Sequence, residues 1–254
     1  MARLLALALI ALAAALGPTG GARAAEVEEP EAQSWPHSGP FGSYDRGALQ
    51  RGLQVYTEVC AGCHGLRLIA FRNLIDIGYS EDQAEAYAAQ FEVAAEPDEE
   101  GEVGVRPARL ADYFVSPFAN ENQARASNNG ALPPDLSLII KARGGGEDYL
   151  HALLTGYRDP PEGVELGEGM EYNPFFPGHQ IAMPAPLSED AVEYEDGTPA
   201  TGEQLARDLT LFRAGASEPT MEARKRMGVK VMLFLFALTA LLYGVKRKVW
   251  SDLH

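Results

Sequence analysis

Hydrophobic and polar positions divide this chain into two long apolar runs and a helix-rich region between them. The first run, Leu4 to Leu16, follows the short basic start Met1-Ala2-Arg3 and precedes the small-residue sequence Ala22-Arg23-Ala24. This order is typical of a secretory signal peptide, so we expect residues 1–24 to be removed and the mature chain to start near Ala25. Thirteen apolar residues are too few to span a bilayer, which disfavours the alternative of an uncleaved anchor.

The second apolar run, Val231 to Val245, contains no charged residue and is followed by Lys246-Arg247-Lys248 and Trp250. A basic flank and an interfacial tryptophan are typical of the end of a transmembrane helix. We therefore expect a C-terminal helix over residues 219–249, with its membrane span at about 228–245. A buried helix of a soluble domain is the alternative, and the basic flanks disfavour it.

The expected signal peptide also sets the orientation of the chain. Because export carries whatever follows the signal across the membrane, we expect residues 25–218 to form an exported domain. Residues 250–254 would then be a short cytoplasmic tail. The positive-inside rule is undecided on its own, since Arg224-Lys225-Arg226 precedes the span and basic residues also follow it.

Apolar residues between the two runs recur mostly at helical spacing, and the predicted fold class is therefore mainly α. Asp45 and Thr201 are the expected N-caps of two of these helices. The acidic segment from Glu92 to Glu102 is expected to be a solvated loop rather than a docking patch. A second long loop, rich in glycine and proline, is expected over 160–176. The expected helices cover residues 45–60, 80–93, 107–114, 120–128, 147–154 and 201–216.

Charge is distributed unevenly along the 254 residues, whose formal net charge is −15. From Ala25 to Thr220 there are 34 acidic and 12 basic residues, whereas from Met221 onward there are 2 acidic and 7 basic ones. The exported domain is therefore strongly acidic. An acidic surface repels phosphates, which argues against a nucleic-acid partner, and it attracts a basic protein during diffusional encounter.

The segment Cys60-Ala61-Gly62-Cys63-His64 has the spacing of a c-type haem attachment site. Each thiol can add to one vinyl group of the porphyrin, and the histidine beside them can ligate the iron. A redox dithiol and half of a zinc site are the alternatives. A structural zinc site normally needs four ligands and these are the only two cysteines, while no βαβ pattern supports a thioredoxin-like dithiol.

A second axial ligand is expected from the segment that contains Met183. A thioether favours ferrous iron, and a His/Met pair raises the potential of a haem. Of the methionines in the exported domain, Met170 lies in a flexible acidic stretch, whereas prolines after Met183 restrict its loop. His151 and His179 are the other rivals. Separately, the rigid Pro133–Ser137 segment, which includes Pro134, could brace a flat ligand.

With both ligand segments placed, the chain from about Trp35 to Trp250 resembles the cytochrome c1 family. The resemblance implies a class I cytochrome c-like haem domain on a single C-terminal transmembrane helix, with one covalent haem c ligated by His64 and Met183. It also implies that Arg143 and Tyr149 lie at the haem propionates. Two departures are an alanine, Ala185, where many relatives have proline, and the lack of an extra cysteine pair. The motifs that carry the resemblance are Cys60–His64, Asn128–Ser137, Gly145–Tyr149, Leu153–Tyr157, Asn173–Gly178, the Met183 loop and Asp196–Thr201.

The family resemblance implies electron transfer within the cytochrome bc1 complex, or ubiquinol–cytochrome c reductase. The partners it implies are cytochrome b, the Rieske iron–sulfur protein, cytochrome c and membrane lipid, in a dimeric complex. The haem domain would lie in the periplasm, on the bacterial inner membrane. Two other functions stay open: a free-standing membrane-anchored monohaem cytochrome c that feeds a terminal oxidase, and a haem enzyme such as a peroxidase.

Overall fold

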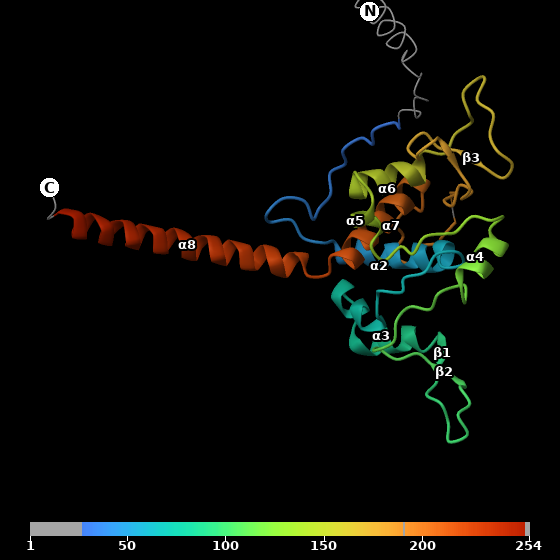
Figure 1. The fold of residues 1–254 in the computed structure, drawn as a ribbon, viewed down its shortest axis with the longest axis horizontal. Coiled ribbons are helices and arrows are strands. Elements are labelled where there is room, and N and C mark those ends of the chain that lie inside the picture. Colours follow the sequence, from blue (N-terminus) through green and yellow to red (C-terminus); the bar gives the residue numbers. More distant parts are fainter. Residues whose placement is uncertain (1–26, 190, 252–254) are drawn as a thin grey trace, which may run out of the picture.

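The computed structural model describes residues 27–189 and 191–251, and its described part is mainly helical (Figure 1). The signal peptide expected over 1–24 lies outside the described residues, as do residues 252–254 of the expected tail. Short strands form two antiparallel pairs within the described part, β1 with β2 and β3 with β4. The elements in chain order are α2 (Arg46–Val55), a π-helix (Tyr56–Cys60), a 3-10 helix (Phe71–Ile77), α3 (Glu81–Ala88), β1 (Glu92–Ala94), β2 (Val105–Pro107), α4 (Glu121–Ser127), α5 (Ile139–Ala142), α6 (Gly146–Thr155), β3 (Glu171–Tyr172), β4 (Gln180–Ile181), α7 (Gly202–Ser217) and α8 (Met221–Trp250).

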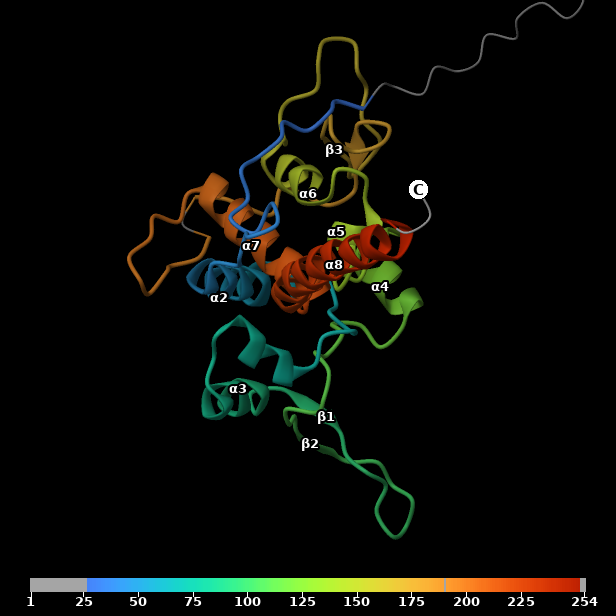
Figure 2. The same cartoon turned by 90° about the vertical axis from the view of Figure 1, so that its left-hand side faces the viewer.

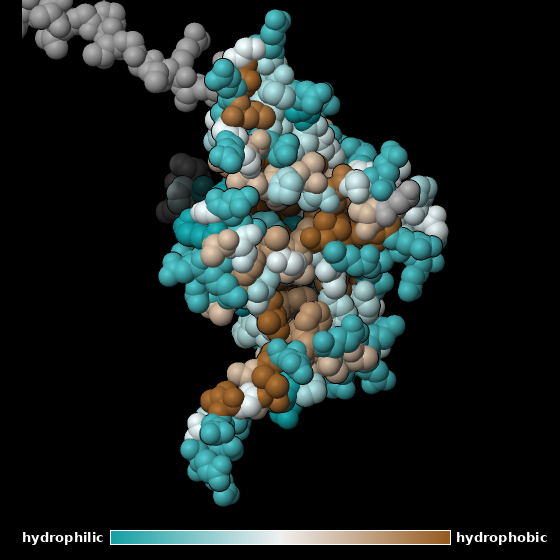
Figure 3. All heavy atoms as spheres, turned by 90° about the vertical axis from the view of Figure 1, so that its right-hand side faces the viewer, coloured by the Kyte–Doolittle hydropathy of each residue, from teal (hydrophilic) through white to brown (hydrophobic). Residues whose placement is uncertain are grey.

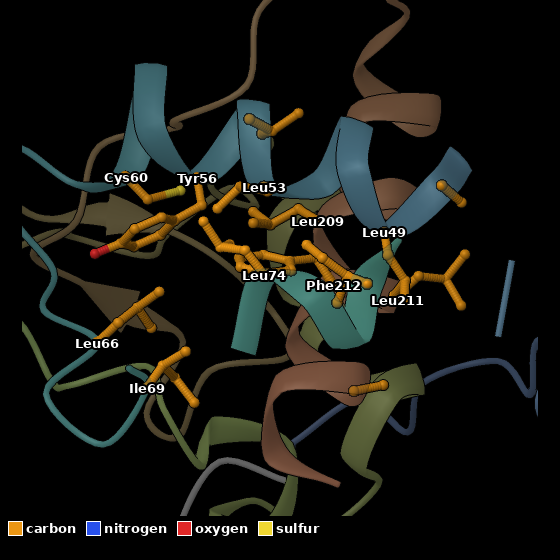
Figure 4. Close-up of a cluster of buried hydrophobic side chains, with 14 of the residues drawn as sticks. Leu49, Leu53, Tyr56, Cys60, Leu66, Ile69, Leu74, Leu209, Leu211 and Phe212 are labelled. Carbon is orange, nitrogen blue, oxygen red and sulfur yellow. The ribbon is translucent and has the colours of Figure 1, made fainter. Parts of the chain in front are cut away.

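Helices α2 and α7 cross at the centre of the core (Figure 4). The apolar stripes predicted for them, which include Leu53 on α2 and Leu209 on α7, are buried against each other. Gly52 is required at the crossing, because a Cβ there would clash with the Asp208 carbonyl oxygen and with Phe212. The close approach that this glycine permits positions the end of α2 and the π-helix after it, whose last residue is Cys60.

Both predicted N-caps are confirmed. The Asp45 side chain accepts a hydrogen bond from the Ala48 N–H at 3.2 Å, and the Thr201 hydroxyl accepts one from the Gln204 N–H at 3.2 Å. Each bond satisfies one of the N–H groups that the first turn of a helix leaves without an intrahelical acceptor. The starts of α2 and α7 were therefore readable from local sequence.

The helix expected over 80–93 is shorter than predicted. It ends at Ala88, and β1 follows instead, paired with β2 so that Val93 lies opposite Arg106. The acidic segment between the strands is thus the end of a hairpin, whose tip is organised by Asp98: its Oδ1 accepts hydrogen bonds from the N–H groups of Glu100 and Glu102. Strand pairing with residues eleven or more positions away has outweighed the local helical spacing.

The prediction of a short helix over 107–114 is wrong. Pro107 ends strand β2, and the chain then runs alongside the start of the 3-10 helix, with the Phe71 N–H donating to the Asp112 carbonyl oxygen. Arg106 holds the segment in this path through two hydrogen bonds to the Asp112 carboxylate, at 2.6 and 2.9 Å. The proline that suggests a first helical turn therefore serves at a strand end, the other position that tolerates a missing N–H.

Helix α8 projects from the domain as a long rod (Figure 1). It is the one helix in the described part that is long and apolar enough to cross a membrane, and none of its most apolar stretch is buried. Its first turn is tied to the domain: Glu222 accepts hydrogen bonds from the Tyr44 N–H at 2.8 Å and from Arg46 at 2.9 Å. Lys225 donates to the His37 carbonyl oxygen. Polar contacts thus hold the first turn of α8 against the domain.

Candidate haem site

Helix α2 continues into a π-helix, Tyr56–Cys60, and the cysteine motif begins at the last residue of that π-helix. The Cys63 and His64 N–H groups both donate to the Cys60 carbonyl oxygen, at 3.0 and 2.9 Å, so the chain folds back at once. Cys60 is buried and Cys63 is exposed. Short π-helical segments are frequent at functional sites, and this one sets both thiols and the imidazole on a single tight turn.

The chemistry of Cys60 argues against a redox dithiol. Burial raises the pKa of its thiol to about 12, so the group is protonated at neutral pH. Reactive redox cysteines instead have a lowered pKa, because the thiolate is the nucleophile. For the zinc alternative, the described ranges 27–189 and 191–251 contain no group of three or more His, Cys, Asp or Glu side chains arranged as a metal site.

The imidazole of His64 is held in the orientation and tautomer that a metal ligand needs. Its Nδ1 lies 2.7 Å from the carbonyl oxygen of Pro134. A carbonyl oxygen only accepts, so Nδ1 carries the proton and Nε2 keeps its lone pair for a metal ion. Burial lowers the pKa of His64, which keeps the ring neutral at pH 7. Pro134 thus has a specific contact in the predicted site.

Two segments far apart in the chain are joined around this histidine. Asp135 accepts hydrogen bonds from the Arg67 N–H at 2.9 Å and from the Ser137 N–H at 3.0 Å. The Leu136 N–H donates to the Gly65 carbonyl oxygen at 2.9 Å, and Tyr56 donates to the His64 carbonyl oxygen at 2.9 Å. We call residues 56–68 together with 133–137 the attachment side of the site.

Met183 lies in a second, smaller apolar cluster. The buried members of the cluster are Tyr149, Leu153 and Ile181, and Met183 is half-buried against them. Tyr157 donates a hydrogen bond to the Met183 carbonyl oxygen at 3.1 Å. We call this cluster, which also contains Tyr157 and Phe176, the methionine side.

The methionine side is built by α6 and by a turn expected as plain loop. Strands β3 and β4 pair in that region, with Tyr172 opposite Gln180, so the loop predicted over 160–176 is wrong at its end. Asn173 is fully buried there and donates to the Leu153 carbonyl oxygen at 2.8 Å. This long-range bond fixes the turn on α6 and so sets the approach of Met183.

The rivals of Met183 have other surroundings. Met170 is 39% exposed. His151 lies buried on α6, with its ring edge-on to Trp35 at 6.0 Å and its Nε2 3.1 Å from a Glu203 carboxylate oxygen. His179 packs against a tyrosine ring. Of these side chains, Met183 is the one that belongs to the cluster with Tyr149.

Tyr149 and Arg143 occupy one edge of the methionine side. Tyr149 is buried, and burial raises the pKa of its hydroxyl group, while the charge of Arg143 opposes that rise. Arg143 itself is exposed. A neutral phenol and a guanidinium side by side are donors that suit a carboxylate.

The predicted residues therefore form two groups. Cys60, Cys63, His64 and Pro134 share the attachment side, whereas Tyr149 and Met183 share the methionine side, with Arg143 at its edge. None of the hydrogen bonds quoted for the attachment side includes a residue of the methionine side. Helix α7 connects them, because it packs against both α2 and α6, and the two views of the ribbon agree on this order (Figures 1 and 2).

The donor set fits a haem with two thioether bonds and a histidine–methionine iron. The attachment side offers two thiols and a neutral imidazole, and the methionine side offers a thioether next to phenol and guanidinium donors. One buried charged residue near this site was missed by sequence reasoning. Arg213 on α7 is fully buried, and its guanidinium nitrogens have no hydrogen-bond partner in the part of the chain that the structure describes.

The Cys-x-x-Cys-His spacing, on a turn that follows a helix and next to a histidine with a free Nε2, places the chain in the class of c-type cytochromes. Comparison with known proteins narrows the class. The model of the Cytochrome C1 family matches residues 35–253, so the chain belongs to the cytochrome c1 family.

Three named relatives match most of the chain. Cytochrome c1 1, heme protein, mitochondrial, of Arabidopsis thaliana is 52% identical over 89% of this chain and 74% of its own length. The cytochrome b-c1 complex catalytic subunit, mitochondrial, of Candida albicans is 52% identical over 88% of this chain and 78% of its own. Cytochrome b/c1 of Bradyrhizobium diazoefficiens is 49% identical over 98% of this chain, which spans only 40% of that protein.

Family membership confirms the predicted fold class and implies a covalently bound haem c. The bacterial relative and the single long apolar helix of the described part fit a membrane-anchored protein.

Proposed function

We propose that this chain is the electron-transferring haem subunit of a cytochrome bc1 complex. Cys60 and Cys63 would hold haem c through two thioether bonds, with His64 and Met183 as the axial ligands of the iron. The bound haem supplies a one-electron couple. The observation that carries the proposal is the 2.7 Å contact between His64 Nδ1 and the Pro134 carbonyl oxygen, which leaves Nε2 free for a metal beside two thiols.

Each remaining site residue has a physical task in this proposal. Pro134 orients the imidazole and keeps its tautomer. Arg143 and Tyr149 would donate hydrogen bonds to the haem propionates, because a carboxylate at the edge of an apolar cluster needs charged or neutral N–H and O–H donors. The aromatic and aliphatic side chains around Met183 exclude water from the thioether side.

The proposed electron path runs from the Rieske iron–sulfur protein through this haem to cytochrome c. Cytochrome b and membrane lipid would contact the anchor, in a dimeric complex, and the haem domain would lie in the periplasm on the bacterial inner membrane. The names of two relatives, cytochrome b/c1 and cytochrome b-c1 complex catalytic subunit, support a cytochrome b partner. With His64 and Met183 both bound to the iron, no position would be left for a substrate, so the reductase activity would belong to the complex.

The acidic surface of the domain favours a basic cytochrome c as the electron acceptor. It disfavours a nucleic-acid partner, because acidic groups repel phosphates. The β1–β2 hairpin projects from the lower part of the domain, with polar residues at its end (Figure 3). Residues of that end are exposed, and they include Glu96, Glu99 and Glu100. Long-range attraction by such charges is screened by salt. We expect the rate of electron transfer to a basic cytochrome c to fall steeply as ionic strength rises, and a rate independent of salt would contradict steering.

Purification from membranes in mild detergent tests the assignment. We expect b-type haem and a Rieske centre to co-purify with the chain, and ubiquinol to reduce its c-type haem. A preparation with one c-type haem and no b-type haem would support the free-standing anchored carrier instead. Rapid binding of carbon monoxide or cyanide would indicate an open iron position and favour a haem enzyme such as a peroxidase.

A further inference from the structure

Arg213 is the residue of this chain whose surroundings are hardest to reconcile with ordinary packing. It is 1% exposed, and none of its Nε, Nη1 and Nη2 atoms has a hydrogen-bond partner within residues 27–189 and 191–251. Its guanidinium carbon lies 4.4 Å from the centre of the Phe212 ring and 5.3 Å from that of Tyr56. These ring contacts stabilise a cation, yet they replace only part of the hydration that it loses on burial.

The titratable groups that interact with Arg213 all belong to the attachment side. Its charge interacts with Tyr56, Cys60, His64 and Asp135. Tyr56 is bonded to the His64 carbonyl oxygen, so the ring under the guanidinium is one hydrogen bond from the predicted iron ligand. The arginine therefore points from α7 toward the turn that carries both cysteines.

Asp135, the carboxylate whose charge acts on Arg213, makes no direct ion pair with it in the part of the chain that the structure describes. The two carboxylate oxygens of Asp135 accept hydrogen bonds from the backbone N–H groups of Arg67 and Ser137. Burial lowers the pKa of Arg213 to about 10, which still leaves the guanidinium protonated at neutral pH. A fixed positive charge thus lies inside the domain, beside the attachment turn.

We propose that Arg213 is a buried cation that raises the reduction potential of the attached haem. The inference rests on the proposed haem site. In the redox step the iron gains one electron from a one-electron donor, which is oxidised, and no bond to Arg213 forms or breaks. Reduction removes one positive charge from the iron, so a nearby fixed cation repels the ferric state more than the ferrous state. Low local polarity strengthens this repulsion, because the guanidinium is shielded from water.

Redox titration of the purified holoprotein, followed through its visible spectrum, tests the proposal. We expect Arg213→Met, which keeps side-chain length without charge, to lower the equilibrium constant for reduction about tenfold, or about 59 mV for a one-electron couple. Arg213→Lys should retain most of the potential. The matched control is Arg207→Met on the same helix, where the guanidinium lies over the Trp35 ring and donates to the Ser34 carbonyl oxygen. That change should shift the constant less than twofold.

Two further measurements on Arg213→Met, the potential at high salt and the stability to denaturant, distinguish an effect of the lost charge from an effect of altered packing. The shift in Arg213→Met should persist at high salt, since a buried charge is poorly screened. The variant should also unfold at a denaturant concentration no lower than that of the wild type, because removal of an unpaired buried charge is often neutral or stabilising. A lower potential accompanied by marked destabilisation would indicate loss of packing and would contradict the proposal.

The outcomes distinguish this inference from the assignment of the haem site. A wild-type chain without covalent haem would overturn the proposed function itself. Covalent haem with an unchanged potential in Arg213→Met would overturn only the role of Arg213. If neither Arg213→Met nor Arg213→Lys holds haem while Arg207→Met does, Arg213 is needed to fold the site rather than to set its potential, and the proposal is wrong.

Discussion

The attachment side is held by hydrogen bonds between two segments about seventy residues apart, whereas the methionine side combines apolar packing around Met183 with a long-range hydrogen bond from Asn173 to the Leu153 carbonyl oxygen. On the attachment side, the Asp135 carboxylate, the Pro134 carbonyl and the Tyr56 hydroxyl each bind residues 64–68. On the methionine side, one hydrogen bond from Tyr157 reaches the Met183 backbone, and the side chain is placed by contacts with Tyr149 and its neighbours.

This difference bears on what each side does. Directional bonds fix the orientation and tautomer of an imidazole, and packing alone does neither. A thioether has no proton to place, and apolar contacts are enough to hold it in a dry environment. We therefore expect changes on the attachment side to affect whether the haem is held, and changes on the methionine side to affect its potential.

Removal of both thiols should have the largest effect. In Cys60→Ala/Cys63→Ala we expect complete loss of covalent haem, because no other cysteine exists in the chain. Haem staining after denaturing electrophoresis measures this directly. The single variant Cys63→Ala is the matched comparison, since it keeps the buried thiol and one possible thioether bond. Haem that stays with the double variant through denaturation would disprove covalent attachment at this motif.

Loss of the thioether should leave the haem in place but change its potential. In Met183→Leu we expect covalent haem to be retained and the equilibrium constant for reduction to fall by at least about tenfold, or about 59 mV. Met170→Leu is the control, since that methionine is 39% exposed and lies outside the cluster. An unchanged potential in Met183→Leu would assign the sixth ligand to another residue.

The sequence predicts the parts of this site that depend on neighbouring residues. The caps at Asp45 and Thr201 and the apolar stripes of α2 and α7 follow local rules, and all are present in the structure. The role of the Pro134 carbonyl is different, because its contact with His64 joins residues 70 positions apart. The sequence suggested a rigid brace there, but it could not show which atom Pro134 would offer.

Two misses have different causes. The β1–β2 hairpin replaced predicted helix because Val93 pairs with Arg106 across a turn, a contact that local spacing does not report. Arg213 was overlooked although a signal existed: it follows Leu205 and Leu209 at intervals of four and therefore puts a charge on the apolar stripe of α7. A charged residue on a stripe that is predicted to be buried marks a candidate functional position, whereas an apolar residue there indicates only packing.

Removal of the Asp135 carboxylate, which holds the two segments of the attachment side together, should destabilise the domain. Asp135→Ala removes the acceptor of two backbone N–H groups, and we expect a loss of about 1–2 kcal/mol in the free energy of unfolding. Denaturant unfolding of the haem-loaded protein measures it. Glu99→Ala, an equal change of charge at the exposed hairpin tip, should lie within about 0.5 kcal/mol of the wild type. Equal losses in both variants would contradict the structural role of Asp135.

Removal of a hydrogen bond on the methionine side should cause a smaller loss of stability. Tyr157→Phe removes one neutral hydrogen bond to the Met183 carbonyl oxygen and preserves the ring, so we expect a loss of about 1 kcal/mol or less. The same unfolding assay applies, with haem potential as a second readout. A loss larger than that of Asp135→Ala would reverse the comparison between the two sides.

The smallest expected effect concerns pH and the helix that carries Tyr149. The hydrogen bond from His37 to Glu147, in the first turn of α6, lowers the pKa of that carboxyl group below its ordinary 4.5. Because the folded pKa is the lower one, the contribution to stability is complete above pH 4.5 and is lost as pH falls through the folded value. Glu147→Gln should therefore reduce the fall in stability below pH 4.5, by less than about 1 kcal/mol because the pair is partly exposed. Glu165→Gln, the same change of charge in the glycine- and proline-rich loop, is the control. If it changed the dependence of stability on pH by the same amount, net charge rather than the α6 contact would explain the loss of stability in acid.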